Sequence, residues 1–436
     1  MGHIKNNFIL SAFILFVHML GAQEVLSLKD AIRIAVEHNY DVRIARNETE
    51  IDKTNNTLGN AGILPRLDFI FGQNYNINNT SQEFFSGETR TGSNVNTSNL
   101  NANLQLAWTL FDGMNMFVNK ERLSEIVQLG QLNVQFQMEN TISQVMSLYY
   151  NIVQHQHRIE TIQKAIEISQ ERLTLARLKK DIGTGSGIPV LQAEVDINSD
   201  SSALIMQHLI FQNTKIQLNE ILGRSPETEF DIIPMNESQE NIDYQGLVEK
   251  ATQRNLLLQM ADKSIRLSEL NLKQWQSNKY PTVDLNLGYN FTRFQAEIGI
   301  LKFNQNNGWS FGLTGRWNIF DGSNNNREIQ VAKLGIETIK LTKEQTALSL
   351  KSNLFTIYNN YRTAQDIKKL EEHNIRVAQQ NLDITTEKMR IGTIDALELR
   401  QAQLNLVDAE FRKITADFES RMSYLELMKL SGQLMN

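Results

Sequence analysis

The sequence predicts a mixed fold in which long coiled-coil α-helices are joined to a small β-sheet, with this whole arrangement duplicated along the chain. Residues 114–182 contain no proline and only one glycine, Gly130, which predicts a helix of roughly 100 Å at 1.5 Å per residue. Four other stretches alternate apolar and polar residues with the period of β-strands. The motif Trp108–Gly113 recurs 209 positions later as Trp317–Gly322. Together these observations predict two interleaved structural repeats.

The first 22 residues have the composition of a secretory signal peptide. Lys5 precedes an apolar run from Phe8 to Leu20, and small residues follow it, so the mature chain is expected to begin at Gln23. A retained membrane anchor is the weaker alternative, because an apolar run of about 13 residues is too short to cross a bilayer. Beyond residue 22 no stretch approaches the roughly 18 consecutive apolar residues of a membrane helix. Any membrane span would therefore consist of β-strands.

The composition argues against several classes of protein and site. The net charge of −6 does not favour nucleic acid as a partner, and without cysteine neither a disulfide framework nor a lipid anchor on cysteine is possible. We find no nucleophile arrangement, phosphate loop or metal-ligand spacing. His155 and His157 are two positions apart and point to different faces of a helix, and Met114 and Met116 are better explained as packing residues. We therefore expect no enzyme activity, no cofactor and no metal.

The repeat extends over most of the chain. At the offset of 209, Ile182-Gly183-Thr184 recurs as Ile391-Gly392-Thr393, and each tripeptide interrupts two helical patterns as the tip of a helical hairpin. Upstream, Pro65 recurs as Pro281 at an offset of 216. The seven-residue difference falls in residues 78–98, which are rich in Asn, Ser, Thr and Gly and predict an exposed loop. We predict one inseparable domain built from the repeats 23–229 and 230–436.

Four β-strands are predicted per chain, two in each repeat. Between Leu100 and Leu110 every second residue is apolar and the others are mostly polar, so one face of the strand is apolar. This alternation is typical of transmembrane barrels and equally of an antiparallel sheet on a soluble core. Four strands cannot close a membrane barrel, which needs at least about eight, so in a membrane several chains would share one barrel. Trp108 and Trp317, near the strand ends, fit an interfacial aromatic girdle or ordinary sheet packing.

The helices carry heptad repeats, which predict coiled-coil packing. The apolar residues that recur every seven positions are Val145, Ile152, Ile159, Ile166 and Leu173; Leu370, Val377, Ile384 and Ile391; and Leu397, Leu404, Phe411, Phe418 and Leu425. Asp112 and Asp321 are expected to cap the two long helices. Shorter return helices are expected at about 188–222 and 397–430, and an irregular segment at 224–244.

Four features occur together in this chain: the duplicated half, the two Trp-x-x-Phe-Asp-Gly motifs, the prolines before the strands and the Ile-Gly-Thr tips. In this order they resemble the TolC-like outer-membrane efflux family. The resemblance covers essentially the whole mature chain. It implies a homotrimer in which three sets of four strands form one 12-stranded barrel in the outer-membrane lipid of a Gram-negative bacterium. The helices would continue this barrel as a coiled-coil tunnel through the periplasm, closed at its lower end.

The resemblance also implies partners and site residues. The tips Ile182, Gly183, Thr184 and Ile391, Gly392, Thr393 correspond to the positions at which the family contacts a periplasmic adaptor protein, which is linked to an inner-membrane transporter. The family closes its tunnel with acidic rings, and Glu398 falls on the first ring. Gln401 replaces the second ring, which Asp395 could supply, and Pro189 replaces the family's latch partner. The alternative is that both acids merely suit the first turn of a helix.

The predicted function is that of a passive exit duct for efflux or type I-like export, working with the adaptor and the pump. The competing interpretation is a non-conducting periplasmic coiled-coil scaffold with a soluble sheet. The signal peptide and the long apolar strand faces favour the duct. A stand-alone porin is disfavoured because helices of about 100 Å would have no purpose in it.

Overall fold

The computed structural model describes residues 24–233 and 242–435. The predicted signal peptide, residues 1–22, and the predicted mature start at Gln23 lie outside these residues. None of the helices in the described part has both the length and the apolar composition needed to cross a membrane.

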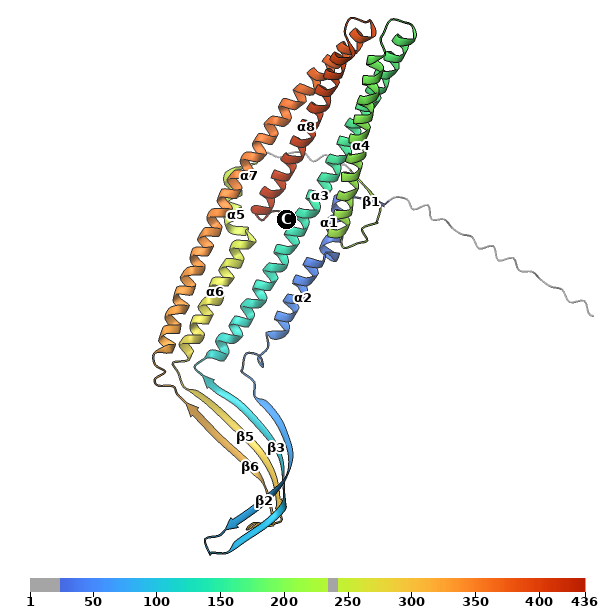
Figure 1. Cartoon of the computed structure of the whole chain (residues 1–436). Coiled ribbons are helices and arrows are strands. Elements are labelled where there is room, and N and C mark those ends of the chain that lie inside the picture. The colour runs from blue at the N-terminus through green and yellow to red at the C-terminus, as the bar shows by residue number, and fades with distance from the viewer. Residues whose placement is uncertain (1–23, 234–241, 436) are drawn as a thin grey trace, which may run out of the picture. The chain divides into compact units, whose positions relative to one another are not determined.

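The described chain contains the same order of elements twice (Figure 1). The first series is α1 (Leu28–His38), α2 (Tyr40–Asn55), β2 (Arg66–Glu83), β3 (Thr89–Asp112), α3 (Asn115–Asp181) and α4 (Ile188–Ile221). The second is α5 (Tyr244–Arg254), α6 (Leu256–Ser277), β5 (Thr282–Ala296), β6 (Phe303–Arg316), α7 (Asn324–Arg390) and α8 (Ala396–Leu430). The boundary between the repeats at residues 229 and 230 stays a prediction.

The described residues form two compact units that alternate along the sequence. We call them the tip unit (residues 24–39, 144–233 and 362–422) and the sheet unit (40–143, 242–361 and 423–435). The tip unit contains both helical hairpin ends, and the sheet unit contains the four long strands.

The two long helices are confirmed. α3 and α7 have 67 residues each, which corresponds to roughly 100 Å. In the tip unit Val145 and Ile152 are fully buried in a core with α1 and α4, as their heptad spacing predicts. On α7, by contrast, Leu370 is 57% exposed and Val377 is 50% exposed. About half of each of these side chains is therefore left uncovered by the described residues of one chain.

Two short strands were not predicted, so the described part has six strands and not four. β1 (Glu24–Leu26) pairs in parallel with β4 (Phe230–Ile232), within a segment expected to be irregular. Tyr149 of α3 lies against both strands, because its hydroxyl is 3.1 Å from the carbonyl oxygen of Leu26 in β1 and 2.8 Å from that of Ile233, which follows β4. Strands of three residues carry too little alternation to be recognised from sequence.

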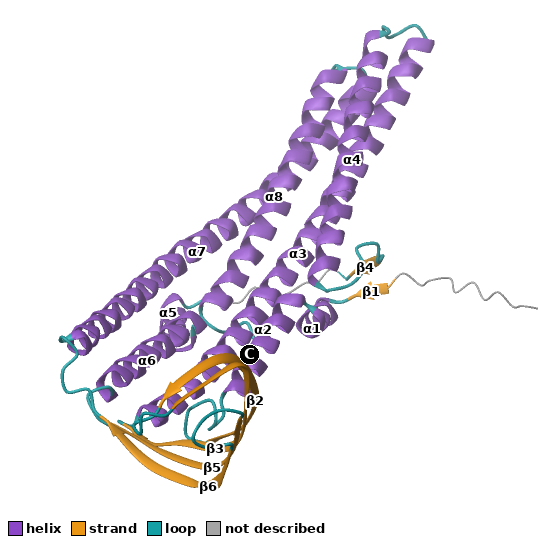
Figure 2. Cartoon of the chain, turned by 60° about the horizontal axis from the view of Figure 1, so that its bottom comes forward, coloured by secondary structure: helices purple, strands orange, loops and turns teal. Residues whose placement is uncertain are grey.

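The four predicted strands form one antiparallel sheet in the order β2-β3-β5-β6, strongly curved in Figure 2. The register places apolar residues opposite one another, since Leu67 lies opposite Leu106, Leu106 opposite Leu287 and Leu287 opposite Phe311. One face of the sheet is therefore apolar from edge to edge, and the other carries mainly Asn, Gln, Ser, Thr and Gly.

The prediction of a loop at residues 78–98 is wrong. β2 and β3 remain paired up to Glu83 and Thr89, so only residues 84–88 form the turn. Polar residues such as Thr and Asn can line a two-stranded ribbon because the ladder already satisfies their backbone groups. Composition alone therefore misassigned this segment.

The chain leaves each half of the sheet through a glycine in the left-handed conformation. Gly113 has φ 69° and Gly322 has φ 70°, a conformation that only glycine adopts without strain. Asp321 accepts a hydrogen bond from the N–H of Asn325 at 2.7 Å and caps α7 as predicted. The cap predicted at Asp112 is not formed, because this residue ends β3 and its buried Oδ1 has no partner among the described residues.

Candidate functional site

The first hairpin tip is a tight turn in which two of its three residues have local structural roles. Gly183 has φ 77°, and its N–H donates to the carbonyl of Lys180 at 3.0 Å. The N–H of Thr184 donates to the carbonyl of Lys179 at 2.9 Å, and its hydroxyl reaches the same oxygen at 3.2 Å. These are the bonds of a Schellman helix end, which requires a residue with positive φ. Ile182 is 64% exposed, so its side chain is the free member of the tripeptide.

The second tip repeats this geometry. Gly392 has φ 82° and donates to the carbonyl of Met389, while Thr393 donates to that of Lys388 through both its N–H and its hydroxyl. Ile391 is 72% exposed. Each tripeptide is thus an isoleucine presented to solvent, followed by a glycine and a threonine that close the end of the helix.

The two tips differ in how the next helix begins. Asp395 caps α8, since its Oδ1 accepts from the N–H groups of Leu397 at 2.9 Å and Glu398 at 3.0 Å. At the first tip the equivalent position of α4 is Gly187, followed by Pro189 in the first turn. Asp395 therefore has a structural role at the start of α8, and an aperture role for it stays a prediction. Glu398 is exposed, and its carboxylate has no hydrogen bond or ion pair in the described part of the chain.

Lysine links the two hairpin ends to each other. Lys179, in the last turn of α3, donates from Nζ to the carbonyl of Met389 in the last turn of α7 at 2.7 Å. A cation at the carbonyl end of a helix is favourable because the last carbonyls lack partners inside the helix. The two tips of the chain thus lie side by side.

A buried ionic network, which the sequence reasoning missed, joins α3, α4 and α8 behind the tips. Arg400 on α8 makes two hydrogen bonds to Asp200 on α4, at 2.9 Å and 2.8 Å. Arg172 on α3 pairs with Asp196, and its side chain is only 2% exposed. The spacing of Asp196 and Asp200, four residues apart on one face of α4, is the sequence signal that could have indicated it.

The network is strongly held. The hydrogen bond to Asp200 raises the pKa of Arg400 although burial opposes this, and Arg400 stays charged at any physiological pH. Breaking a buried pair by removing one partner commonly costs about 3–5 kcal/mol. Beside the pair, Gln403 is fully buried and donates to the carbonyl of Ala165 and to the hydroxyl of Ser169. The first turns of α8 are therefore fixed to the other hairpin of the same chain.

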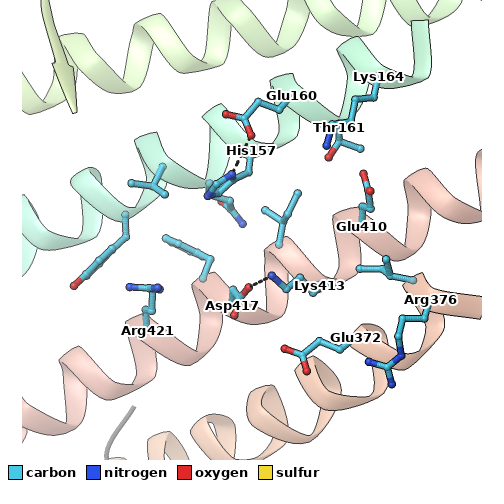
Figure 3. A pocket seen from close by; sticks show the side chains of 16 residues that line it. His157, Glu160, Thr161, Lys164, Glu372, Arg376, Glu410, Lys413, Asp417 and Arg421 are labelled. Carbon is cyan, nitrogen blue, oxygen red and sulfur yellow. Dashed lines mark hydrogen bonds and ion pairs between the residues drawn. The ribbon is translucent and has the colours of Figure 1, made fainter. Parts of the chain in front are cut away.

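A groove of the tip unit lies between α3, α7 and α8, and side chains of both charges line it (Figure 3). Figure 3 shows Lys413 bonded to Asp417 and His157 bonded to Glu160, at 2.9 Å and 3.3 Å. Burial alone would raise the pKa of Asp417, but hydrogen bonds from Lys368 and Lys413 lower it. Acids and bases neutralise each other here, so the groove does not favour a ligand of either charge.

Trp108 and Trp317 each donate a hydrogen bond to a backbone carbonyl. Their indole N–H groups bond the carbonyls of Ile63 at 2.9 Å and Lys279 at 3.1 Å, in the segments that precede β2 and β5. Their rings are 39% and 60% exposed. Each tryptophan therefore connects the end of one strand to the start of the neighbouring strand, and part of its ring remains exposed. This geometry agrees with either of the two roles expected for them.

No cluster of three or more potential metal ligands occurs in residues 24–233 and 242–435. His155 bonds Gln207 at 2.9 Å, and burial, followed by the charge of Arg158, lowers the pKa of this histidine. Its neighbour His157 pairs with Glu160 instead. The two histidines thus have separate structural partners.

Comparisons with known proteins agree with this architecture. The chain is 19% identical over 381 residues to outer membrane protein TolC of Vibrio cholerae serotype O1, covering 87% of this chain and 84% of that one. It is 19% identical over 339 residues to outer membrane efflux protein BepC of Brucella suis biovar 1, covering 76% and 72%. Among solved structures, the outer-membrane channel OprN superposes with a TM-score of 0.76 at 17% identity, covering 93% and 90%. This last similarity concerns the fold alone.

A family comparison assigns the chain as a whole. The model of the outer membrane efflux protein family matches residues 31–224 and 247–433, which include all long strands and both hairpin tips. Members of this family are channels rather than enzymes, and they lie in the Gram-negative outer membrane with a helical tunnel in the periplasm. The chain belongs to the outer membrane efflux protein family.

Proposed function

We propose that the chain forms the exit duct of a tripartite export system, together with a periplasmic adaptor and an inner-membrane transporter. The observation that carries this proposal is the apolar face of the sheet. Phe69 is 68% exposed, Trp309 76% and Phe311 84%, and no other described element covers them. A sheet that exposes aromatic and aliphatic side chains on one face and polar side chains on the other suits lipid outside and water inside.

A ring of identical chains is supported by the two edges of the sheet. β2 and β6 each pair on one side only, so both edges present unpaired backbone groups, which hydrocarbon does not tolerate. Pairing of β2 from one copy with β6 of the next satisfies both edges and closes a ring, because unlike edges make a head-to-tail interface. Three copies would give the 12-stranded barrel that the family resemblance implies.

Unlike apolar stripes on the helices support the same ring. In the sheet unit, Leu341 and Leu348 on α7 are 58% and 70% exposed, and Ile44 and Ile51 on α2 are 54% and 59% exposed. The tip unit repeats this arrangement with residues from α7 and α4. The exposed residues there are Leu370, Val377 and Ile384 on α7, and Leu191, Val195 and Ile205 on α4. Such stripes are stabilised when the α7 stripe of one copy packs on the α2 and α4 stripes of another.

The tips are the proposed contacts for the adaptor. Ile182 and Ile391 are exposed and have no role in closing their turns, so they are available to a partner. Gly183 and Gly392 have no neighbouring atom within 4 Å of an added Cβ, so another backbone can approach closely.

The proposed aperture consists of Glu398 from each chain, with Asp395 one turn before it. Several carboxylates around a narrow pore attract cations and exclude anions. Glu398 is exposed and unpaired in the described chain, which leaves its charge available, whereas Asp395 also serves as the helix cap.

Single-channel recordings in planar lipid bilayers test the duct and its aperture. Glu398→Gln removes the charge, and Asp395→Asn does the same while keeping a side chain that caps helices well. The double variant is expected to have higher conductance and a lower preference for cations than the wild type. Glu387→Gln, an exposed acid in the last turns of α7, is the matched control and should change neither quantity. Unchanged conductance and selectivity in the double variant would exclude both acids from the aperture, and absence of any wild-type channel would contradict the duct.

The non-conducting scaffold is the less favoured alternative. A scaffold does not require an apolar sheet face that stays exposed, whereas a membrane duct does.

A further inference from the structure

The β2–β3 hairpin extends well beyond the rest of the sheet. β3 and β5 are paired only as far as Thr97 and Ala296, but β2 and β3 continue to Glu83 and Thr89. The turn between β5 and β6, by contrast, begins directly after Ala296, where the pairing of β3 with β5 ends. One hairpin of each chain therefore reaches past the barrel that the four strands would form.

This extension is bent rather than straight, as the lower end of Figure 1 shows. The strand register shifts between Asn78 and Thr80, where Asn79 of β2 lies opposite two residues of β3, Ser93 and Asn94, so β3 carries the extra residue of a β-bulge. Asn94 has φ 54°, a left-handed conformation that asparagine tolerates better than most residues. The N–H of Asn94 donates to Oδ1 of Asn79 at 3.0 Å and holds the bend. A bulge of this kind bends a strand and strengthens its twist.

The direction of the bend follows from what it buries. Val95 and Ala296 belong to the polar face of the sheet, because the apolar residues of β3 have even numbers and those of β5 have odd numbers. They are nevertheless only 4% and 7% exposed. A Cβ added at Gly92 would meet Val95 at 2.7 Å and Ile298 at 2.2 Å, so the hairpin backbone at Gly92 lies directly against Val95 and against Ile298 of the β5–β6 turn. The hairpin is therefore folded toward the polar face, which is the inner face in a barrel.

Contacts with the β5–β6 turn anchor the bent hairpin. Arg90 donates from Nη1 to the carbonyl of Gly299 at 3.0 Å. Asn96 donates from its backbone and its side chain to the carboxylate of Glu297, at 2.9 Å and 3.1 Å. These bonds lower the pKa of Glu297, so it stays ionised and keeps accepting them at physiological pH. The anchor therefore joins the long hairpin to the short one.

We propose that the bent hairpin, residues 79–94, narrows the outer mouth of the duct, with Phe85 as the constricting side chain. Phe85 is fully exposed at the turn, where Gly87 with φ 81° closes the hairpin. When several copies close a barrel, the turn of each chain lies over the lumen, and the phenyl groups of Phe85 from the different chains approach one another there. This inference rests on the proposed duct, since a constriction needs a lumen.

Single-channel conductance of the full chain tests the constriction. Asn94→Val places a β-branched residue where φ must be positive, which opposes the bend, whereas Asn94→Gly permits it and is the matched control. Phe85→Ala removes the constricting ring at an exposed position and does not depend on how well Asn94→Val folds. Ile300→Ala is its control, because Ile300 is 83% exposed in the other turn.

Asn94→Val and Phe85→Ala are expected to raise the conductance at least about 1.5-fold, and both controls should match the wild type. Wild-type channels together with unchanged conductance in Phe85→Ala would overturn the constriction and leave the duct standing. If the wild type forms no channel at all, both the duct and the constriction are contradicted.

Discussion

Glu139 on α3 is an acid buried in the sheet unit. Its side chain is 6% exposed, and burial raises its pKa to about 7, although the charge of Lys429 acts in the opposite direction. A carboxyl group in such a place is more stable protonated than ionised. The stability of the helical part should therefore depend on pH in a range that a periplasmic protein experiences.

The sign of this dependence follows from proton linkage. Glu139 has its ordinary pKa of about 4.5 in the unfolded chain, so between pH 4.5 and 7 the folded chain binds more protons. The stabilisation is fully present below pH 4.5 and is lost as the pH rises through 7, by at most about 3 kcal/mol. Glu139→Gln should raise the thermal midpoint relative to the wild type at pH 8 and change it little at pH 4.5. Glu249→Gln, an exposed acid on α5, should show no such difference; equal midpoints for Glu139→Gln and the wild type at pH 8 would contradict the burial argument.

At the scale of elements, each hairpin tip combines a closed helix end with one free apolar side chain. Glycine and threonine satisfy the last carbonyls of α3 and α7, which leaves Ile182 and Ile391 without a structural function in their turns. Both side chains are therefore available for the proposed contact with the adaptor.

Changing only these two side chains tests the docking of the adaptor. Ile182→Asp combined with Ile391→Asp should abolish export in cells, because two charges would be placed in an apolar contact. Folding and assembly should be unaffected, since both residues are exposed. Ile300→Asp in the β5–β6 turn introduces the same charge elsewhere and should leave export intact. Normal export by the double variant would show that the tips do not carry the contact.

Much of the fold could be predicted because its patterns are long. The helices α3 and α7 have 67 residues each and contain heptad repeats, and the alternation in β3 and β5 is strict enough to identify the apolar face. The strands β1 and β4, of three residues each, were missed because their stability comes from Tyr149 and the pairing and not from a local pattern. The loop at 78–98 was wrong because polar composition also suits a two-stranded ribbon.

The site was predictable only where it depends on local turn chemistry. The Ile-Gly-Thr tips and the acid at the start of α8 could be identified because a helix end and a helix cap have sequence signals. The network of Arg172, Asp196, Asp200 and Arg400 joins three helices that are distant in sequence. The packing of the helices decides which of the many charges meet, so a single sequence did not reveal it.

At the scale of the whole molecule, a single chain leaves strand edges and apolar surfaces without partners among its described residues. Its sheet has two unpaired edges and an uncovered apolar face, and its helices expose two unlike apolar stripes. All of these features are satisfied at once if three chains close a ring in the outer membrane. Native mass spectrometry of the protein extracted from isolated outer membranes tests this directly. We expect a complex of three chains in that fraction, and recovery as a monomer from the soluble periplasmic fraction would contradict the account.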